Sequence, residues 1–143
     1  MLYLSHRDTK GRCLEIIIYH MEFDVSMLLL RLALGLIFIV HGWPKVKNVK
    51  MTSQHFESMG FKPGNLWGPI VAFVEFIGGL AVFFGIFAQV AALGLALNML
   101  VALFWKIGKG QGLIGGFELD LILLASALAV VFLGAGAYAV VLN

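Results

Sequence analysis

A single apolar stretch of forty residues, Leu66 to Trp105, constrains the fold of this chain more than any other feature. Glu75 is its only ionisable side chain. Because an α-helix rises about 1.5 Å per residue, about 20 residues cross a hydrocarbon core of about 30 Å. The stretch is long enough for two crossings, with residues 85–89 between them. It therefore predicts a pair of antiparallel membrane helices.

Two polar side chains lie near the middle of these two helices. Glu75 lies twelve residues before Phe87, and Asn98 lies eleven residues after it. In antiparallel helices both side chains fall at nearly the same depth, close to the bilayer midplane, so we expect them to meet. A carboxyl group at that depth costs at least about 2.5 kcal/mol on insertion scales. It should therefore face the bundle interior and be paired, hydrated or protonated.

The composition of the whole chain supports a membrane protein. Of its 143 residues 61% are hydrophobic and 13% are charged, whereas soluble proteins average about 25% charged residues. We predict an all-α fold, an integral membrane four-helix bundle, with no room for a separate soluble catalytic domain. The expected domain covers residues 21–143, and its spans lie at about 26–43, 66–86, 88–105 and 119–142.

Residues 1–20 lack the continuous apolar region and small-residue cleavage site of a signal peptide. Two interpretations fit this segment. It is either an ordered amphipathic or interfacial segment, or an upstream extension that is not native or is disordered. The second is favoured because Met21 begins a sequence that looks like a complete start to the first span.

The distribution of charge indicates a membrane topology signal. The loops after the first and third spans hold six lysines, and the net charge of the chain is only +2. We therefore exclude nucleic acid as a partner and expect the lipid bilayer instead. The positive-inside rule places the lysine loops in the cytoplasm, although Arg7, Lys10 and Arg12 argue for the opposite orientation if residues 1–20 are native.

Small residues recur at helical spacing on the faces expected to pack. Glycine lets two membrane helices approach closely because it has no side chain. The glycines predicted at helix contacts are Gly35, Gly42, Gly78, Gly79 and Gly94. Between the first two spans, the sequence around Phe56 and Met59 predicts a short helix lying in the membrane interface.

The candidate catalytic residues are Glu75 and His41. The helix rise places them within about 4–6 Å of one another along the bundle axis. One interpretation is a pair that handles protons beside a quinone-sized cleft; the other is a hydrogen-bonded pair that fixes helix register. The candidate ligand-binding residues are Asn98, Arg31, Lys45 and Glu118.

Three of these ligand-binding candidates also have a structural interpretation. Arg31 is expected to extend toward the membrane interface, and Asn98 to join two helices by a hydrogen bond. Glu118, together with Asp120, is expected to complement the dipole at the start of the fourth span. Glu118 at the rim of the site is the alternative.

No metal site or haem is expected from the sequence. Only His41 among the histidines lies inside a predicted span, whereas a haem iron with two axial protein ligands would need a second one, such as Met99. The single cysteine, Cys13, cannot form an intramolecular disulfide or a CxxC pair.

Four segments of the chain together resemble the DoxX family. They are LLLRLALGLIFIVHGWPKV, VEFIGGLAVFFGIFAQVAALGLALNM, IGGFELDLILLASAL and the closing GAGAY. The usual aspartate after the last motif is absent, because Tyr138 is followed by AVVLN. The resemblance implies a multi-pass four-helix protein of a bacterial-type plasma membrane. The family includes a subunit of an archaeal thiosulfate:quinone oxidoreductase and membrane partners of redox-defence enzymes.

Three functions remain open at this stage. The resemblance favours an accessory or quinone-linked subunit of a membrane redox system, more than a self-sufficient enzyme, with a redox enzyme as partner. The first alternative is a small-solute or proton pathway formed by a homo-oligomer around Glu75. The second is a non-catalytic membrane scaffold in which all polar groups serve packing.

Overall fold

The computed structural model describes residues 5–140, with side chains from residue 11 onward, and every regular element in that range is a helix. The elements are α1 (Ser5–Lys47), α2 (Val49–Ser58), α3 (Gly64–Phe84), α4 (Ala88–Gly108), the short π-helical turn η1 (Leu113–Phe117) and α5 (Glu118–Leu133). Among the described residues, four helical stretches are long and apolar enough to cross a membrane: Gly11–Lys47, Gly64–Phe84, Ala88–Gly108 and Leu113–Leu133. The prediction of an all-α membrane bundle is confirmed.

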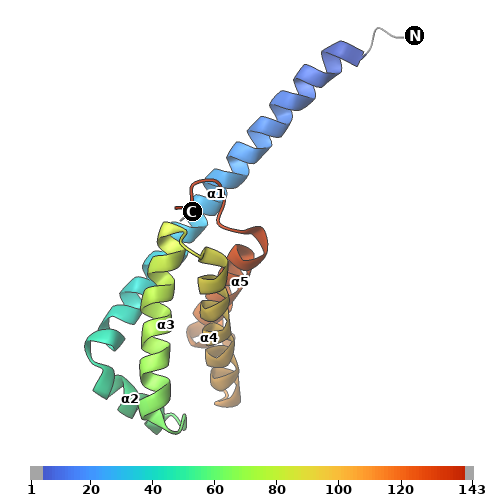
Figure 1. Cartoon of the computed structure of the whole chain (residues 1–143). Helices are drawn as coiled ribbons and strands as arrows, with labels where there is room; N and C mark the ends of the chain where they lie inside the picture. The colour runs from blue at the N-terminus through green and yellow to red at the C-terminus, as the bar shows by residue number, and fades with distance from the viewer. Residues whose placement is uncertain (1–4, 141–143) are drawn as a thin grey trace.

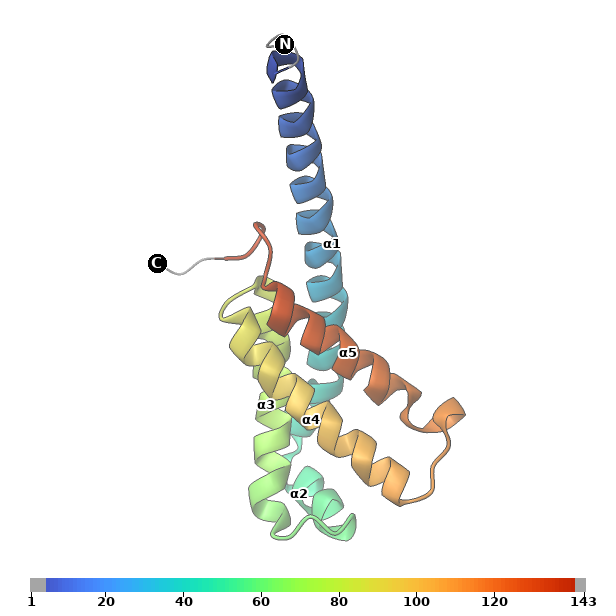
Figure 2. The ribbon, with the colours of Figure 1, turned by 90° about the vertical axis from the view of Figure 1, so that its right-hand side faces the viewer.

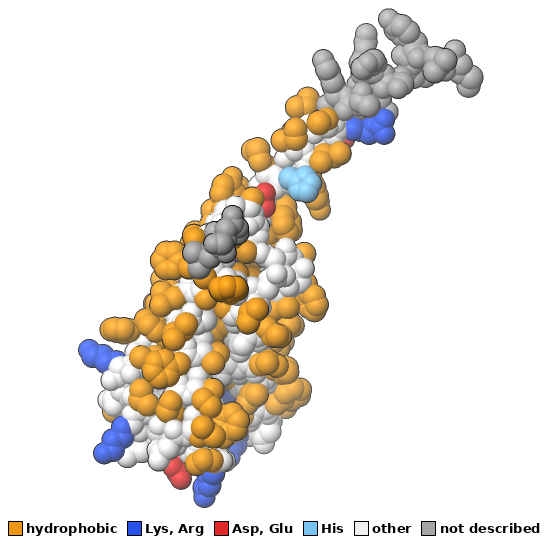
Figure 3. All heavy atoms as spheres, in the orientation of Figure 1, with side chains coloured by type: hydrophobic (Ala, Val, Ile, Leu, Met, Phe, Trp, Pro, Cys, Tyr) orange, Lys and Arg blue, Asp and Glu red, His pale blue; other side chains and the backbone are white. Residues whose placement is uncertain are grey.

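The bundle is built from two helix pairs. Helix α3 packs along α1, and α4 packs along α5, while α3 and α4 join the pairs (Figures 1 and 2). Helix α2 folds back against the start of α3, and the first part of α1 extends beyond the bundle at the opposite end. Figure 3 shows apolar side chains over most of the visible bundle surface, with basic side chains, coloured blue, at its lower end. We call the end that carries α2 the lysine end and the opposite one the turn end.

The contact between α1 and α3 depends on glycines. A Cβ atom at Gly42 would lie 2.7 Å from the backbone nitrogen of Phe76, and one at Gly79 would lie 2.9 Å from that of Ile39. At Gly35 the nearest atom, 2.7 Å away, belongs to α3 as well. Any larger residue at these positions would push two backbones apart.

The glycines on the α3–α4 side are less tightly packed. A Cβ atom at Gly78 would meet Leu95 at 3.2 Å, and one at Gly94 would meet Val74 at 3.6 Å, an ordinary contact. Leucine and valine side chains therefore occupy the space beside these glycines.

Helix α1 is longer at both ends than the first predicted span. It continues past Pro44 to Lys47, although the first span was predicted to end at about residue 43. Proline removes one donor from the helix, but its carbonyl still accepts a hydrogen bond from the Asn48 N–H at 3.1 Å. The predicted extension, residues 1–20, is helical from Ser5 onward, and residues 1–4 lie outside the described range.

The last span ends earlier than predicted. The sequence predicts a helix to about residue 142, whereas α5 ends at Leu133. Gly134 and Gly136 adopt φ values of 82° and 72°, a conformation that breaks the helix and that glycine tolerates best. Residues 134–140 then form an irregular C-terminal segment across the turn end, and residues 141–142 lie outside the described range.

Candidate functional site

Glu75 is buried in the bundle and held by two other helices. The Glu75 carboxylate, on α3, accepts a hydrogen bond from Lys45 Nζ of α1 at 2.5 Å and another from Asn98 Nδ2 of α4 at 2.9 Å. Glu75 is only 3% exposed, while the Lys45 side chain is 34% exposed. The predicted contact between Glu75 and Asn98 is confirmed, and Lys45 forms an ion pair with the buried carboxylate.

A second ion pair joins the two helices of the other pair. Lys106 Nζ, in the last turn of α4, lies 2.6 Å from Asp120 Oδ2, in the first turn of α5. Lys106 Nζ also donates to the carbonyl of Gly116 at 3.3 Å. From the sequence, Asp120 was predicted to have only a role at the helix start, and no role was predicted for Lys106. The sequence signal for this ion pair was the location of the two residues at the ends of consecutive helices, on opposite sides of one loop.

Both ion pairs line one pocket of about 190 Å³ at the lysine end. His41 lines it too, so five side chains of the pocket can exchange protons or form hydrogen bonds. Its remaining walls are apolar and come from Ile37, Phe38, Met99, Leu119 and Leu123. Half of the lining residues are polar and half are apolar, and polar groups that converge on a cavity with apolar walls are typical of a small-molecule site.

His41 faces this pocket without bonding to Glu75. Among the described residues, no hydrogen bond joins the two, and the oxygens of Glu75 are held by Lys45 and Asn98. Asn98 binds Glu75 but is not one of the pocket-lining residues. Both candidate catalytic residues therefore lie at one cavity, but Lys45, and not His41, bonds to Glu75.

The other two sequence candidates lie outside this pocket. Glu118 is exposed at the start of α5, and its neighbour Asp120 is the acid that turns inward. Arg31 lies at the turn end, where its Nη2 donates to the carbonyl of Tyr138 at 3.0 Å. Arg31 therefore extends toward the turn end as expected, but the C-terminal segment covers its side chain there and leaves Arg31 0% exposed.

The described residues contain no group of three or more His, Cys, Asp or Glu side chains that could hold a metal ion. The groups of the pocket that can take part in proton transfer are its lysines, carboxylates and imidazole.

Comparison with known proteins identifies similar chains. The DoxX family model matches residues 26–107, more than half of the chain. A Bacillus subtilis (strain 168) protein named "Putative oxidoreductase CatD" is 32% identical over 113 residues, which cover 79% of this chain and 82% of that protein. "Inner membrane protein YqjF" of Escherichia coli (strain K12) is 33% identical over 119 residues, 82% of this chain and 90% of that protein. No solved structure matches the chain.

Proposed function

Since the chain belongs to the DoxX family and is a multi-pass protein of the bacterial inner membrane, we propose that it is a quinone-linked accessory subunit of a membrane redox system. The observation that carries this proposal is the pocket at the lysine end, where His41 and two lysine–carboxylate pairs meet apolar walls. Ionisable groups inside a membrane bundle are costly and are functional more often than those in soluble proteins.

The size and polarity of the pocket suit the head group of a quinone. Its volume of about 190 Å³ is smaller than drug-sized sites of about 300–1,000 Å³. The pocket therefore accommodates a ring with its substituents, while an isoprenoid tail would extend into the surrounding lipid. The apolar side chains of Phe38 and Met99 supply a surface for the ring.

The polar groups of the pocket match the proton chemistry of a quinone. Lys45, Lys106 and His41 can donate hydrogen bonds to its two carbonyl oxygens. Reduction to the quinol takes up two electrons and two protons. In this proposal a partner redox enzyme supplies the electrons, and Glu75 and Asp120 pass the protons through their lysine partners or His41. The name of the Bacillus relative agrees with a redox association.

The binding step can be tested with decylubiquinone on the purified full chain in mild detergent. A ligand at about 100 times its Kd stabilises a protein by about 2.7 kcal/mol, so we expect the melting temperature to rise by several degrees. Decanol, which has a similar chain without the quinone ring, should have no such effect. The variant Lys106→Gln should weaken the shift.

Lys109→Gln is the matched control for Lys106→Gln. Lys109 lies just after the end of α4, three residues from Lys106, with Nζ 5.6 Å from the ring centroid of Trp105, and does not line the pocket. Equal responses of the two variants, or no response of the parent chain to decylubiquinone, would show that this pocket does not bind quinone.

The accessory role has its own test. Co-purification in mild detergent should recover a redox enzyme with the chain, and repeated failure to do so would remove that role without affecting the binding result. Proton flux that depends on Glu75 in proteoliposomes would instead favour the alternative of a proton pathway. If every pocket variant acts only through stability, the scaffold interpretation holds.

A further inference from the structure

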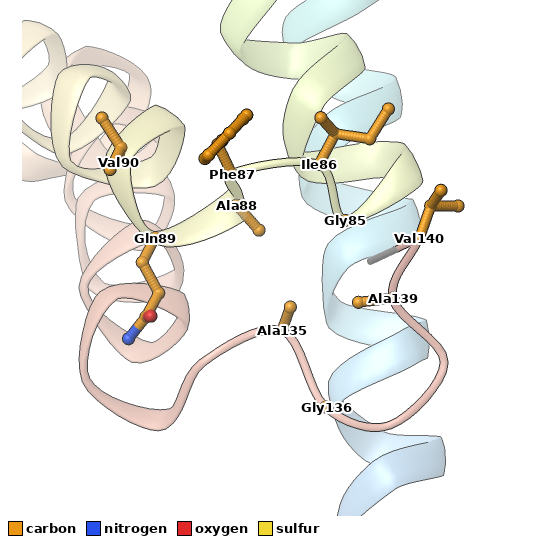
Figure 4. Close-up of a pocket in the computed structure, with 10 residues that line it drawn as sticks. All are labelled: Gly85, Ile86, Phe87, Ala88, Gln89, Val90, Ala135, Gly136, Ala139 and Val140. Atoms are coloured by element: carbon orange, nitrogen blue, oxygen red, sulfur yellow. The ribbon is translucent and has the colours of Figure 1, made fainter. Parts of the chain in front are cut away.

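The turn end holds a second and larger pocket. It has a volume of about 360 Å³ and lies between the C-terminal segment and residues 85–90, which comprise the link from α3 and the first turn of α4. Figure 4 shows the two segments facing one another, with Ala135, Gly136, Ala139 and Val140 opposite the turn. Because residues 85–87 join two spanning helices, the pocket lies at the membrane surface, at the depth of lipid head groups.

Arg31 lies behind the wall of this pocket with an incomplete set of partners. Its Nη2 binds the neutral carbonyl of Tyr138, while Nε and Nη1 have no hydrogen-bond partner among the described residues. Nη1 lies beside Gly85, which lines the pocket together with Ala139. A Cβ atom at position 85 would overlap Nη1, so a glycine at this position lets the buried guanidinium group pack directly behind the pocket wall.

The start of α4 provides a second positive feature at the same pocket. Ala88, Gln89 and Val90 form its first turn and line the pocket, and Phe87 gives this helix no side-chain cap. The Gln89 side chain donates to the Val131 carbonyl at 2.9 Å instead. The free N–H groups of a first turn carry partial positive charge and commonly bind anions.

We propose that this pocket binds the phosphate group of a phospholipid at the N-terminus of α4, with the buried Arg31 directly behind the pocket wall as its counter-charge. A buried guanidinium without a counter-charge is costly, and a lipid phosphate at this depth would supply one. The nearest described acid on α1 is Asp24, seven residues before Arg31 and about 10 Å away along the helix. Its Oδ1 accepts the Ala137 N–H at 2.8 Å, so it is engaged with the C-terminal segment.

The experiment measures thermal stabilisation of the purified full chain in dodecyl maltoside. The added probes are dioleoyl phosphatidylglycerol, dioleoylglycerol, which lacks the phosphate, and inorganic phosphate. We expect stabilisation by the phospholipid alone. Stabilisation by inorganic phosphate as well would support the same anion site with a soluble ligand. Equal effects of the two lipids would overturn the proposal.

A pair of variants at Val90 assigns the effect to this pocket. Val90 is 71% exposed and lies in the first turn of α4, where an acidic residue is favourable for the helix, so Val90→Asp should fold. The new carboxylate would compete with phosphate and should weaken phospholipid binding by about tenfold or more. Val90→Asn has nearly the same size without the charge and should bind within about twofold of the parent chain. Equal binding by both variants would place the lipid elsewhere.

Discussion

The two ends of the bundle bury charge in different ways. At the lysine end Glu75 and Asp120 each lie within 2.6 Å of a lysine nitrogen, at 2.5 Å and 2.6 Å. At the turn end Arg31 is fully buried, and its one recorded hydrogen bond goes to a neutral carbonyl. At the lysine end each buried carboxylate is paired with a lysine, whereas the buried Arg31 at the turn end has no acidic partner among the described residues.

This difference suggests two kinds of site in one small bundle. Removing a lysine at the lysine end strands a carboxylate inside the membrane, so charge and stability are tightly linked there. Removing Arg31 strands no opposite charge, because its counter-ion in our proposal comes from outside the chain. The two ends should therefore respond differently to the same kind of substitution.

The largest effects on stability are expected at the contact between α1 and α3, which runs from one end of the bundle to the other. Gly35 faces Phe83 near the turn end, and Gly42 faces Phe76 near the lysine end, with prospective Cβ contacts of 2.7 Å at each. Gly35→Val and Gly42→Val should each destabilise the bundle by about 3 kcal/mol or more, because the obstruction includes backbone. Unfolding in detergent measures this loss.

Gly94→Ala is the control for the glycine variants. Its new Cβ atom would lie 3.6 Å from Val74, so the change should stay within about 0.5 kcal/mol. If Gly35→Val and Gly42→Val behave like Gly94→Ala, the α1–α3 contact is not what holds the two ends together.

The next comparison removes one cation from each end. Lys45→Met leaves the buried carboxylate of Glu75 with Asn98 alone and should cost about 3 kcal/mol. Arg31→Met loses one hydrogen bond to the Tyr138 carbonyl and should cost less than about 1 kcal/mol in phospholipid-free detergent. Chemical unfolding of both variants gives the two numbers. Similar losses would mean that Arg31 has a counter-charge within the chain.

The sequence predicted the lysine end more fully than the turn end. Helix rise alone placed Glu75 and Asn98 at one depth, and they form a hydrogen bond. It could not choose between His41 and Lys45 as the partner of Glu75, because they lie one helical turn apart and a lysine side chain is long enough to reach back. The Lys106–Asp120 pair depends on the conformation of residues 109–117, whose glycines fit many backbone paths.

The turn end was predicted poorly because hydropathy was the main guide. Residues 134–140 are apolar enough to extend a span, yet two glycines with positive φ end the helix, and Asp24 and Arg31 bind the segment that follows. Contacts between residues more than one hundred positions apart are invisible to periodicity. The coverage of Arg31 depends on this segment and could not have been inferred from the first span alone.

A smaller change in stability separates proton handling from packing at the lysine end. Glu75→Gln keeps the size of the side chain and an acceptor for Asn98, while Lys45 is exposed enough to reach water. The cost should be less than about 1 kcal/mol. If Glu75 transfers protons, quinone-linked activity should nevertheless be lost, because Gln cannot titrate.

His41→Ala tests whether Glu75 and His41 act as one unit. It should abolish the same activity, and the double variant should be no worse than either single one. Full activity in a folded Glu75→Gln protein would exclude proton transfer and leave Glu75 with a packing role.

The smallest expected effect concerns the attachment of the C-terminal segment over Arg31. Asp24→Asn replaces a charged acceptor for the Ala137 N–H with a neutral one, so the loss should be about 0.5 kcal/mol. Local opening should increase more than global unfolding, because Val140 still binds the Phe84 carbonyl at 3.1 Å and α5 is untouched. Hydrogen exchange should accelerate at Ala137 and remain unchanged in α5. Ser126→Ala, which removes a hydrogen bond to Ile122 on an exposed face of α5, is the control and should leave Ala137 protected. If Asp24→Asn does not accelerate exchange at Ala137, this contact does not hold the segment in place, and the cover over Arg31 depends on the remaining contacts at the turn end.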